Sequence, residues 1–460
     1  MALKKWLVGM MVLWCAGILC VLGAYVFWLK VEDHRLRAVQ ASIKDSGLPN
    51  SAKGLFSQVP QADRNAAPLL KRAAEIVKKM PKDSPALRCT PGASLEKKNT
   101  ARLPEKELAA IRRFCEEPAS KEALQLLSEA AKKEEGYFAR DYAKGIALDS
   151  SELNFLFPSL RLLLNRSWCL AMGGDVAGGV SEMRSGMRIS EFYLNDPLLI
   201  CWLVGVSGEQ MCLPAIMDLL AKTDVAPREM DDLEISVKAI RGMVRTTLVR
   251  AFDGERIFFG ASIFEQLLSR NIGPSEILSA FGVSASSGKV NSQAEGLVLI
   301  YQYPLRPFLI ADYAAYLRFM LGIRKVILDP QAGDREAKRL AEKIPRTAFL
   351  TRISAPAFGS ILGKLHEVEV SLDLALLGLR AEKFRMGNGH YPPSLAEVPG
   401  PLPKDPFTGG EFHYKESDGN ILIYSVGPDL VDNQGNAVKV KGERDIVWSV
   451  RRSAVPGESH

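Results

Sequence analysis

The sequence lacks the compact motifs that mark most nucleotide-binding and hydrolytic sites. It contains no phosphate-binding loop, no dinucleotide-binding glycine pattern and no G-x-S-x-G nucleophile turn. Only five histidines occur, and His366, in the run "HEVEV", is not followed four residues later by the second histidine of a zinc metalloprotease helix. We therefore expect a protein that is not an enzyme, and we infer no small-molecule substrate.

Charge of one sign is nowhere concentrated. The chain has 59 Lys and Arg against 53 Asp and Glu, and the net charge of +6 is spread along its length without a basic block. A nucleic-acid-binding surface requires a basic patch or stripe. No nucleic-acid partner is therefore expected.

Cysteine spacing also excludes the usual zinc and redox motifs. None of the seven cysteines forms a C-x-x-C or Cys/His pattern. Cys89 and Cys115 flank a polar, proline-containing segment, and the sequence leaves open whether they form a disulfide. The cysteines of apolar helical runs read as small core residues, namely Cys169, Cys201 and Cys212.

A long apolar run near the N-terminus is the strongest positive feature. Residues 6–29, "WLVGMMVLWCAGILCVLGAYVFWL", are 24 residues without a charge, with Trp6 and Trp28 near the two ends. A helix of this length spans the roughly 30 Å hydrocarbon core of a bilayer. A cleaved signal peptide usually has a shorter apolar region that ends in small residues, whereas Tyr25, Phe27 and Trp28 close this one. The run predicts an uncleaved signal anchor, with a cleaved signal peptide and a buried soluble helix as the alternatives.

Charges around this run are ambiguous about orientation. Lys4 and Lys5 favour a cytoplasmic N-terminus. Four basic residues beyond the other end favour the opposite orientation, namely Lys30, Arg35, Arg37 and Lys44. Long domains translocate largely regardless of charge, so an exported body is still favoured.

Residues 31–360 have the pattern of a helical body. Apolar residues recur at helical spacing in short runs that break at "GGD" (173–175) and "NDP" (195–197). We expect a polar helix over about 105–135, an apolar helix over about 198–220 and surface loops at 81–104 and 284–296. Short helices joined by tight turns are typical of helical hairpins and tetratricopeptide-like stacks, although no 34-residue repeat is present.

Residues 361–460 predict a small α+β module. A long helix is expected from about Ser360 to Met386, ended by Gly387 and Gly389. The runs "EFHYK" and "ILIYSV" flank Asp418-Gly419, which is typical of an antiparallel hairpin. The predicted fold is thus mainly α, with a transmembrane anchor at 1–30, a helical domain at 31–360 and this module.

Four ordered motifs in the last hundred residues resemble a known family. "RAEKFRMGNGHYPPSLAEV", "DPFTGGEFHY", "LIYSVGPD" and "RDIVW" are similar to the globular C-terminal region of the major pseudopilins of type II secretion systems. The resemblance implies an extracytoplasmic domain that packs against copies or partners. The apolar run lacks the glutamate that follows the pseudopilin cleavage point, and a long helical body intervenes. The whole chain resembles single-pass bacterial membrane proteins that place a helical body, with an "NAAPL" element like residues 65–69, before a pseudopilin-like end.

The same resemblance implies a calcium site in the loop after "LIYSVGPD". A carbonyl of Ser425 or Val426, together with Asp429 and Asp445, would be the ligands, and Arg444 stands where a second acid is often found. Asp432 is a substitute ligand. Calcium requires six to eight oxygens. The alternative is a solvated turn whose acids orient the backbone, with Arg444 paired to one of them in place of the metal.

Together these features predict a single-pass protein of the bacterial inner membrane with its body on the extracytoplasmic side. We expect a structural or protein-interaction role with protein partners in the cell envelope, associated with a secretion or envelope assembly. The alternative is an envelope hydrolase whose site forms only in the fold. Calcium is the one cofactor considered.

Overall fold

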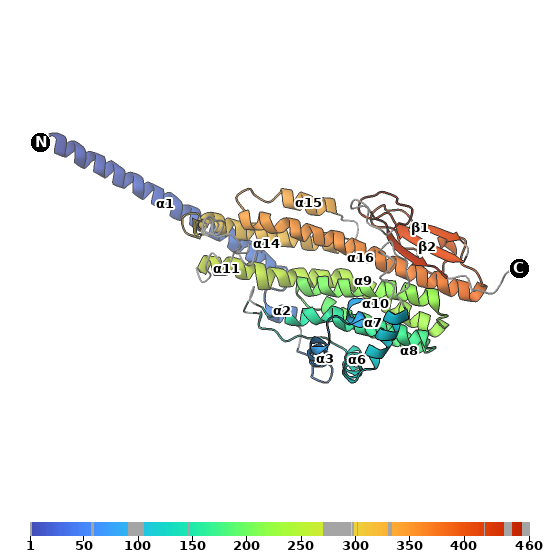
Figure 1. Ribbon diagram of the computed structural model, residues 1–460. Coiled ribbons are helices and arrows are strands. Elements are labelled where there is room, and N and C mark those ends of the chain that lie inside the picture. The colour runs from blue at the N-terminus through green and yellow to red at the C-terminus, as the bar shows by residue number, and fades with distance from the viewer. Residues whose placement is uncertain are drawn as a thin grey trace.

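The chain folds into a mainly helical body with a small antiparallel sheet near its C-terminus (Figure 1). The computed structural model describes residues 2–56, 59–90, 105–142, 144, 148–269, 296, 299–300, 302–329, 334–417, 419–436 and 444–452. Most of the two predicted surface loops, at 81–104 and 284–296, therefore lies outside the described residues.

The helices and strands have the following bounds: α1 Ala2–Asp45, α2 Ala52–Leu55, α3 Ala67–Lys79, α4 Pro85–Arg88, α5 Glu105–Glu116, α6 Pro118–Ala131, η3 Ser151–Phe155, α7 Leu156–Met172, α8 Val176–Leu194, α9 Leu199–Lys222, α10 Pro227–Gly254, the π-helical turn η4 Glu255–Ala261, α11 Ser262–Ser269, α14 Arg306–Leu328, α15 Asp334–Glu342, α16 Phe349–Asn388, η5 Leu395–Glu397, β1 His413–Ser417, β2 Asn420–Ser425 and β3 Ile446–Val450.

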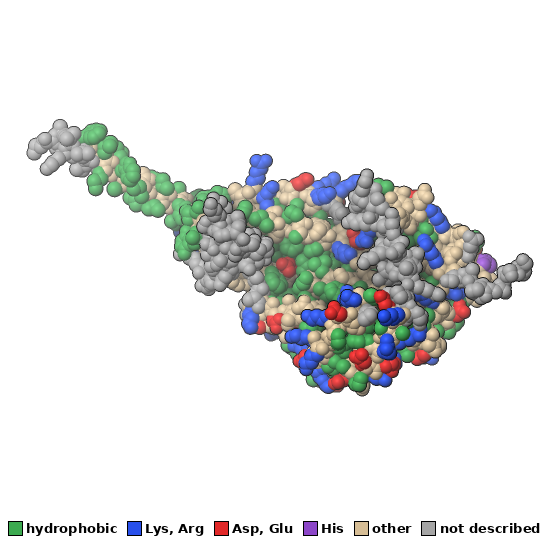
Figure 2. Space-filling model, viewed as in Figure 1, with side chains coloured by type: hydrophobic (Ala, Val, Ile, Leu, Met, Phe, Trp, Pro, Cys, Tyr) green, Lys and Arg blue, Asp and Glu red, His purple; other side chains and the backbone are tan. Residues whose placement is uncertain are grey.

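Helix α1 has two parts with different environments. Its N-terminal part projects away from the body and is covered with apolar side chains (Figures 1 and 2). Its C-terminal part packs along α14 and buries Leu36, Val39 and Ile43 in the main core. In the described chain, α1 and α9 are long and apolar enough to cross a membrane. The apolar stretch of α1 is entirely exposed, whereas 61% of that of α9 is buried, as expected of a core helix.

Helices α7, α8 and α9 pack consecutively as helical hairpins, joined by the predicted breaks at 173–175 and 195–197. Gly205 and Gly208 allow close approach of α9 to α8. A Cβ at Gly205 would lie 2.9 Å from the Ser190 carbonyl oxygen, and one at Gly208 would lie 2.4 Å from the Ser190 hydroxyl. The hairpins agree with the predicted helical body, and the tetratricopeptide-like arrangement stays a prediction.

Two predicted helix boundaries are wrong. The single helix expected over 105–135 is divided into α5 and α6, because Pro118 lacks the N–H that a continuing helix requires and instead starts α6. Helix α16 begins at Phe349, eleven residues before the expected start at Ser360. The carboxylate of Asp312 accepts hydrogen bonds from the N–H groups of Leu350 (2.8 Å) and Thr351 (3.1 Å). This cap comes from α14, so the local sequence does not reveal it.

The predicted hairpin is present, and "RDIVW" supplies a third strand in the order β1-β2-β3. On one face of the sheet, Ile423 lies opposite Trp448 and Ile421 opposite Val450, and all four are buried. This face packs on α16, which ends at Gly389 in a left-handed conformation (φ 80°).

Sheet and body share one hydrophobic cluster that extends from Leu36 of α1 to Val450 of β3. Body and sheet share this cluster because α16 contributes apolar side chains to both. The predicted division between residues 360 and 361 falls inside α16.

Buried Glu382 of α16 ties the segments that follow that helix. Its carboxylate accepts hydrogen bonds from the Tyr391 hydroxyl, from Arg385 Nε (2.9 Å) and from Arg452 Nη2 (3.3 Å). Tyr391 lies in the proline-stiffened crossing, and Arg452 lies just beyond β3. One carboxylate thus joins the start and the end of the module.

Cys89 and Cys115 are both free thiols, so the disulfide that the sequence left open is not formed. The Cys115 thiol of α5 instead shares a hydrogen bond with Cys169 of α7. This bond, together with burial, raises the pKa of Cys115.

Two glycines of α16 give a matched test of how the sheet packs. A Cβ at Gly378 would lie 1.9 Å from Trp448 Nε1, and that indole is almost fully buried, whereas a Cβ at Gly387 would meet no atom within 4 Å. Gly378→Ala should lower the free energy of unfolding by about 1–3 kcal/mol through overpacking. Gly387→Ala should leave it unchanged or raise it by up to about 1 kcal/mol. Denaturant unfolding in mild detergent measures both, and equal effects would contradict the packing of Trp448 on α16.

Candidate functional site

The loop between β2 and β3 holds the residues predicted to bind calcium. Asp445 is 2% exposed, and its two carboxylate oxygens accept hydrogen bonds from the N–H groups of Asn433 (3.2 Å) and Gly435 (2.6 Å). A buried acid just before β3 therefore fixes the backbone of the loop that precedes it.

The other predicted ligands also form hydrogen bonds within the C-terminal module. Asp429 accepts from Val431 N–H (3.1 Å) and Asp432 from Gln434 N–H (2.7 Å), so both form Asx turns. The Ser425 hydroxyl donates to Asp405 (2.8 Å) at the predicted Asp-Pro turn.

The loop has two further features: an unusual backbone conformation at two residues and an ion pair to α16. Leu430 and Gln434 have positive φ angles of 59° and 58°, which residues with a Cβ rarely adopt. Arg444, one residue before Asp445, pairs with Glu367 of α16 at 3.8 Å. Asp445 thus fixes the loop through its backbone N–H groups, and Arg444 connects the loop to α16.

The contacts of Asp429, Asp432 and Asp445 correspond to the alternative in which the acids orient the backbone. In the part of the chain that the structure describes, no group of three or more Asp, Glu, His or Cys side chains is placed to hold a metal ion. Calcium binding here would rely on carbonyl oxygens and water in addition to these acids. The calcium site stays a prediction.

A second polar region, which the sequence did not predict as a site, is a cleft of about 240 Å³ between residues 134–138, α8 and α10. Aromatic and charged side chains line it, including Phe56, Tyr137, Arg188, Glu191, Asp196 and Arg250. Ligand sites usually combine such apolar walls with a few charged groups.

Arg140 lies behind the floor of the cleft, with a side chain that is 3% exposed. It forms ion pairs with Glu152 and with Asp196, which is the middle residue of the "NDP" break. Burial raises the pKa of Asp196, while Arg140 opposes this shift. Asp196 Oδ2 accepts a hydrogen bond from Arg140, whereas its buried Oδ1 has no hydrogen-bond partner among the described residues.

Arg250 differs from the other arginines of the cleft. Its guanidinium donates to the Leu55 carbonyl (2.9 Å), lies over the Phe56 ring (5.8 Å to the centroid) and has no carboxylate within ion-pair distance among the described residues. Burial lowers its pKa, and the more distant carboxylates of Asp196 and Glu135 offset this shift only in part. Arg188, by contrast, pairs with Glu191.

The wall of the cleft is positioned by Asn65 of the "NAAPL" element. Its side-chain amide donates to the Tyr137 carbonyl (3.0 Å) and accepts from the N–H groups of Tyr137 (2.9 Å) and Ala67 (3.1 Å). Asn65 thus starts α3 and also holds residues 135–137. Gly136 is required here, because a Cβ would lie 2.4 Å from Phe192. In the sequence, this cleft is marked only by the "NAAPL" and "NDP" motifs. Neither motif indicates that the two segments lie together in the fold.

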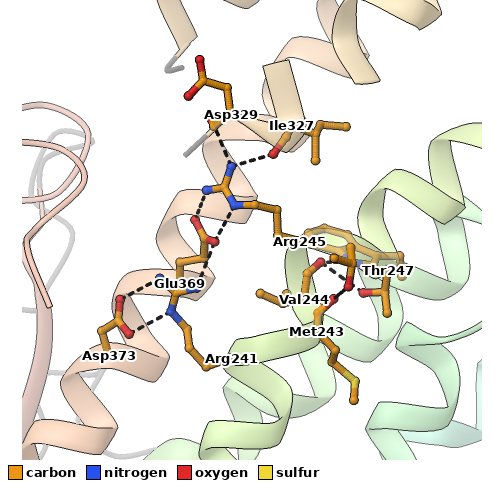
Figure 3. A network of polar contacts seen from close by, with 11 residues as sticks. Arg241, Met243, Val244, Arg245, Thr247, Ile327, Asp329, Glu369 and Asp373 are labelled. Atoms are coloured by element: carbon orange, nitrogen blue, oxygen red, sulfur yellow. Dashed lines mark hydrogen bonds and ion pairs between the residues drawn. The ribbon is translucent and has the colours of Figure 1, made fainter. Parts of the chain in front are cut away.

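Helices α10 and α16 are joined by a buried network of charges (Figure 3). Glu369 is 2% exposed and accepts hydrogen bonds from Arg241 (3.1 Å) and Arg245 (2.9 Å). Asp373 binds Arg241 through both oxygens, at 2.8 and 3.1 Å. Arg245 also donates to the Ile327 carbonyl (2.7 Å) at the end of α14. The network thus holds three helices together, and its acids and bases are paired with each other.

Comparison with known proteins gives no relative: no protein-family model, no curated protein and no solved structure matches this chain. The pseudopilin-like character of the C-terminal module therefore stays a prediction.

The charge network of Figure 3 predicts a large effect from one uncharged isostere. Glu369→Gln leaves two arginines without their shared carboxylate and should lower the free energy of unfolding by about 3 kcal/mol. The matched control is Glu367→Gln on the same helix. Glu367 is 26% exposed and forms only long, solvent-accessible ion pairs with Lys364 (3.6 Å) and Arg444 (3.8 Å), so its loss should cost less than about 1 kcal/mol. Denaturant unfolding in detergent compares the two variants, and equal losses would contradict the structural role of Glu369.

Calcium binding predicts a ligand-dependent stability. If the loop binds calcium, the ion at a hundredfold excess over its dissociation constant should stabilise the full chain by about 2.7 kcal/mol, and a chelator should remove this gain. Asp429→Asn should abolish the response. Thermal unfolding with calcium and with chelator measures it, and identical midpoints would leave the acids with a purely backbone-orienting role.

Proposed function

We propose that this protein is a membrane-anchored, extracytoplasmic interaction protein of the bacterial envelope. In this proposal α1 crosses the inner membrane with its N-terminus in the cytoplasm, and the helical body captures a segment of a protein partner in the cleft that Arg250 lines.

The observation that carries the anchoring is the exposure of α1. Most of its apolar stretch projects from the body (Figure 1), and side chains such as Leu13 and Trp14 are about three-quarters exposed, at 75% and 74%. Water-exposed apolar surface of this extent is unfavourable in a soluble monomer. A bilayer removes it from water.

The cleft supports an interaction role through Arg250. A partly buried guanidinium without a carboxylate partner gains most from a ligand that supplies one, because charge-assisted hydrogen bonds are the stronger ones. Phe56 and Tyr137 add aromatic walls that suit a peptide chain. The expected ligand is therefore a carboxylate-bearing segment of a partner, either an acidic side chain or a chain terminus.

The alternative of an envelope hydrolase would use Asp196 and Glu152, the two carboxylates that converge on Arg140 beside the cleft. Both form ion pairs with Arg140, and this arrangement favours a structural role for them. We therefore retain the interaction role as the proposal. The pseudopilin-like module is proposed as a second contact region within a secretion-associated or envelope assembly.

Crosslinking on intact spheroplasts tests this function. A membrane-impermeant, amine-reactive crosslinker should modify lysines of the body and join the chain to a partner of defined mass. Arg250→Gln should reduce the joined product about tenfold, as expected for the loss of one charge-assisted bond.

Arg184→Gln is the matched control, because Arg184 lies on α8 and pairs with Asp232 at 3.0 Å without lining the cleft. Absence of lysine modification would contradict the extracytoplasmic orientation. Modification with equal crosslinking of both variants would contradict the cleft as the docking site.

A further inference from the structure

A patch of exposed apolar side chains lies just before α14. We call it the collar, and it consists of Leu299 (46% exposed), Ile300 (48%), Tyr303 (47%) and Leu305 (37%). Four large apolar residues within seven positions are unusual on a water-exposed surface. The question is what covers them.

The collar is attached to α1 at the point where this helix meets the body. The Tyr25 hydroxyl donates to the Tyr303 carbonyl at 3.0 Å. One turn further along α1, Trp28 packs edge-to-face on Phe308 of α14, with ring centroids 4.7 Å apart. Figure 2 shows apolar side chains along the projecting part of α1, toward its junction with the body.

The attachment fixes the depth of the collar in a bilayer. The apolar run of α1 ends at Leu29, four residues after Tyr25, and four residues of helix correspond to about 6 Å. The 24-residue run is about 36 Å long against a hydrocarbon core of about 30 Å, which leaves about 3 Å beyond each face. Tyr25, and with it Tyr303, therefore comes to lie close to the boundary between acyl chains and headgroups.

From this geometry we infer that the collar is a second membrane-contacting element, which inserts into the headgroup–acyl boundary beside α1. The inference rests on the membrane-anchored function proposed above. Its occupant is lipid, because the collar is continuous with a helix whose apolar run is already long enough to span the bilayer. Tyr303 and Trp28 supply the amphipathic aromatic side chains that favour this depth, and Lys30 follows them at the level of the phosphates.

The collar therefore seats the body directly on the membrane surface. Fluorescence quenching in lipid nanodiscs tests this arrangement with the full chain. A fluorescent amino acid is incorporated in place of Ile300, and the nanodiscs contain phosphatidylcholine brominated either near the headgroup or near the end of the acyl chain. The probe at Ile300 should lose most of its emission with the shallow bromines and less with the deep ones.

Two further positions serve as controls. Ile18 (46% exposed) lies in the middle of the apolar run and should be quenched most by the deep bromines. Ile235 (59% exposed) lies one residue after Glu234, which pairs with Arg380 near the far end of α16, and should be quenched by neither.

Quenching at Ile18 but not at Ile300 would overturn the collar while leaving the anchor intact. If the probe at Ile300 were then also protected from aqueous iodide, a protein would cover the patch instead of lipid. Absence of quenching at both positions would overturn the membrane anchor itself, so the two failures are distinguishable.

Discussion

The fold depends on the burial of α16 from two opposite sides. This 40-residue helix packs against α10 and α14 of the body and, further along, against the sheet. Its interior stretch is apolar enough to serve both contacts, and Gly378 makes room for the Trp448 indole. Because body and sheet share this helix, the sheet depends on the same hydrophobic core as the body. Loss of packing at one end of α16 should therefore also destabilise the elements packed at its other end.

The charges along α16 fix its axial position relative to α10. Apolar surfaces tolerate sliding, whereas a shift of α16 by one turn would leave the buried Glu369 without Arg241 and Arg245. Further along the same pair of helices, Glu234 of α10 repeats the arrangement with Arg380 (3.0 Å) and Lys383 (2.7 Å). Two ionic contacts at separate points allow one alignment of α10 and α16.

Sequence patterns predicted the helical class, the apolar N-terminal helix and the hairpin, because apolar periodicity and turn residues act locally. They did not predict the early start of α16, which Asp312 caps from another helix, or the restart at Pro118. The cleft was also missed, since Asn65, Tyr137, Asp196 and Arg250 come from distant segments. For the β2–β3 loop, the sequence singled out the acids but not their backbone N–H partners, because these partners depend on how the loop folds.

The continuity of α1 has a mechanical consequence. No glycine or proline occurs between Tyr25 and Asp45, and the helix passes without a break from its exposed apolar part to side chains in the main core. In the membrane-anchored arrangement proposed above, α1 is thus a stiff rod without a hinge between the bilayer and the body. A thinner bilayer makes a long apolar helix tilt. Because the rod has no hinge, such a tilt would rotate the whole body, including the cleft, relative to the membrane plane.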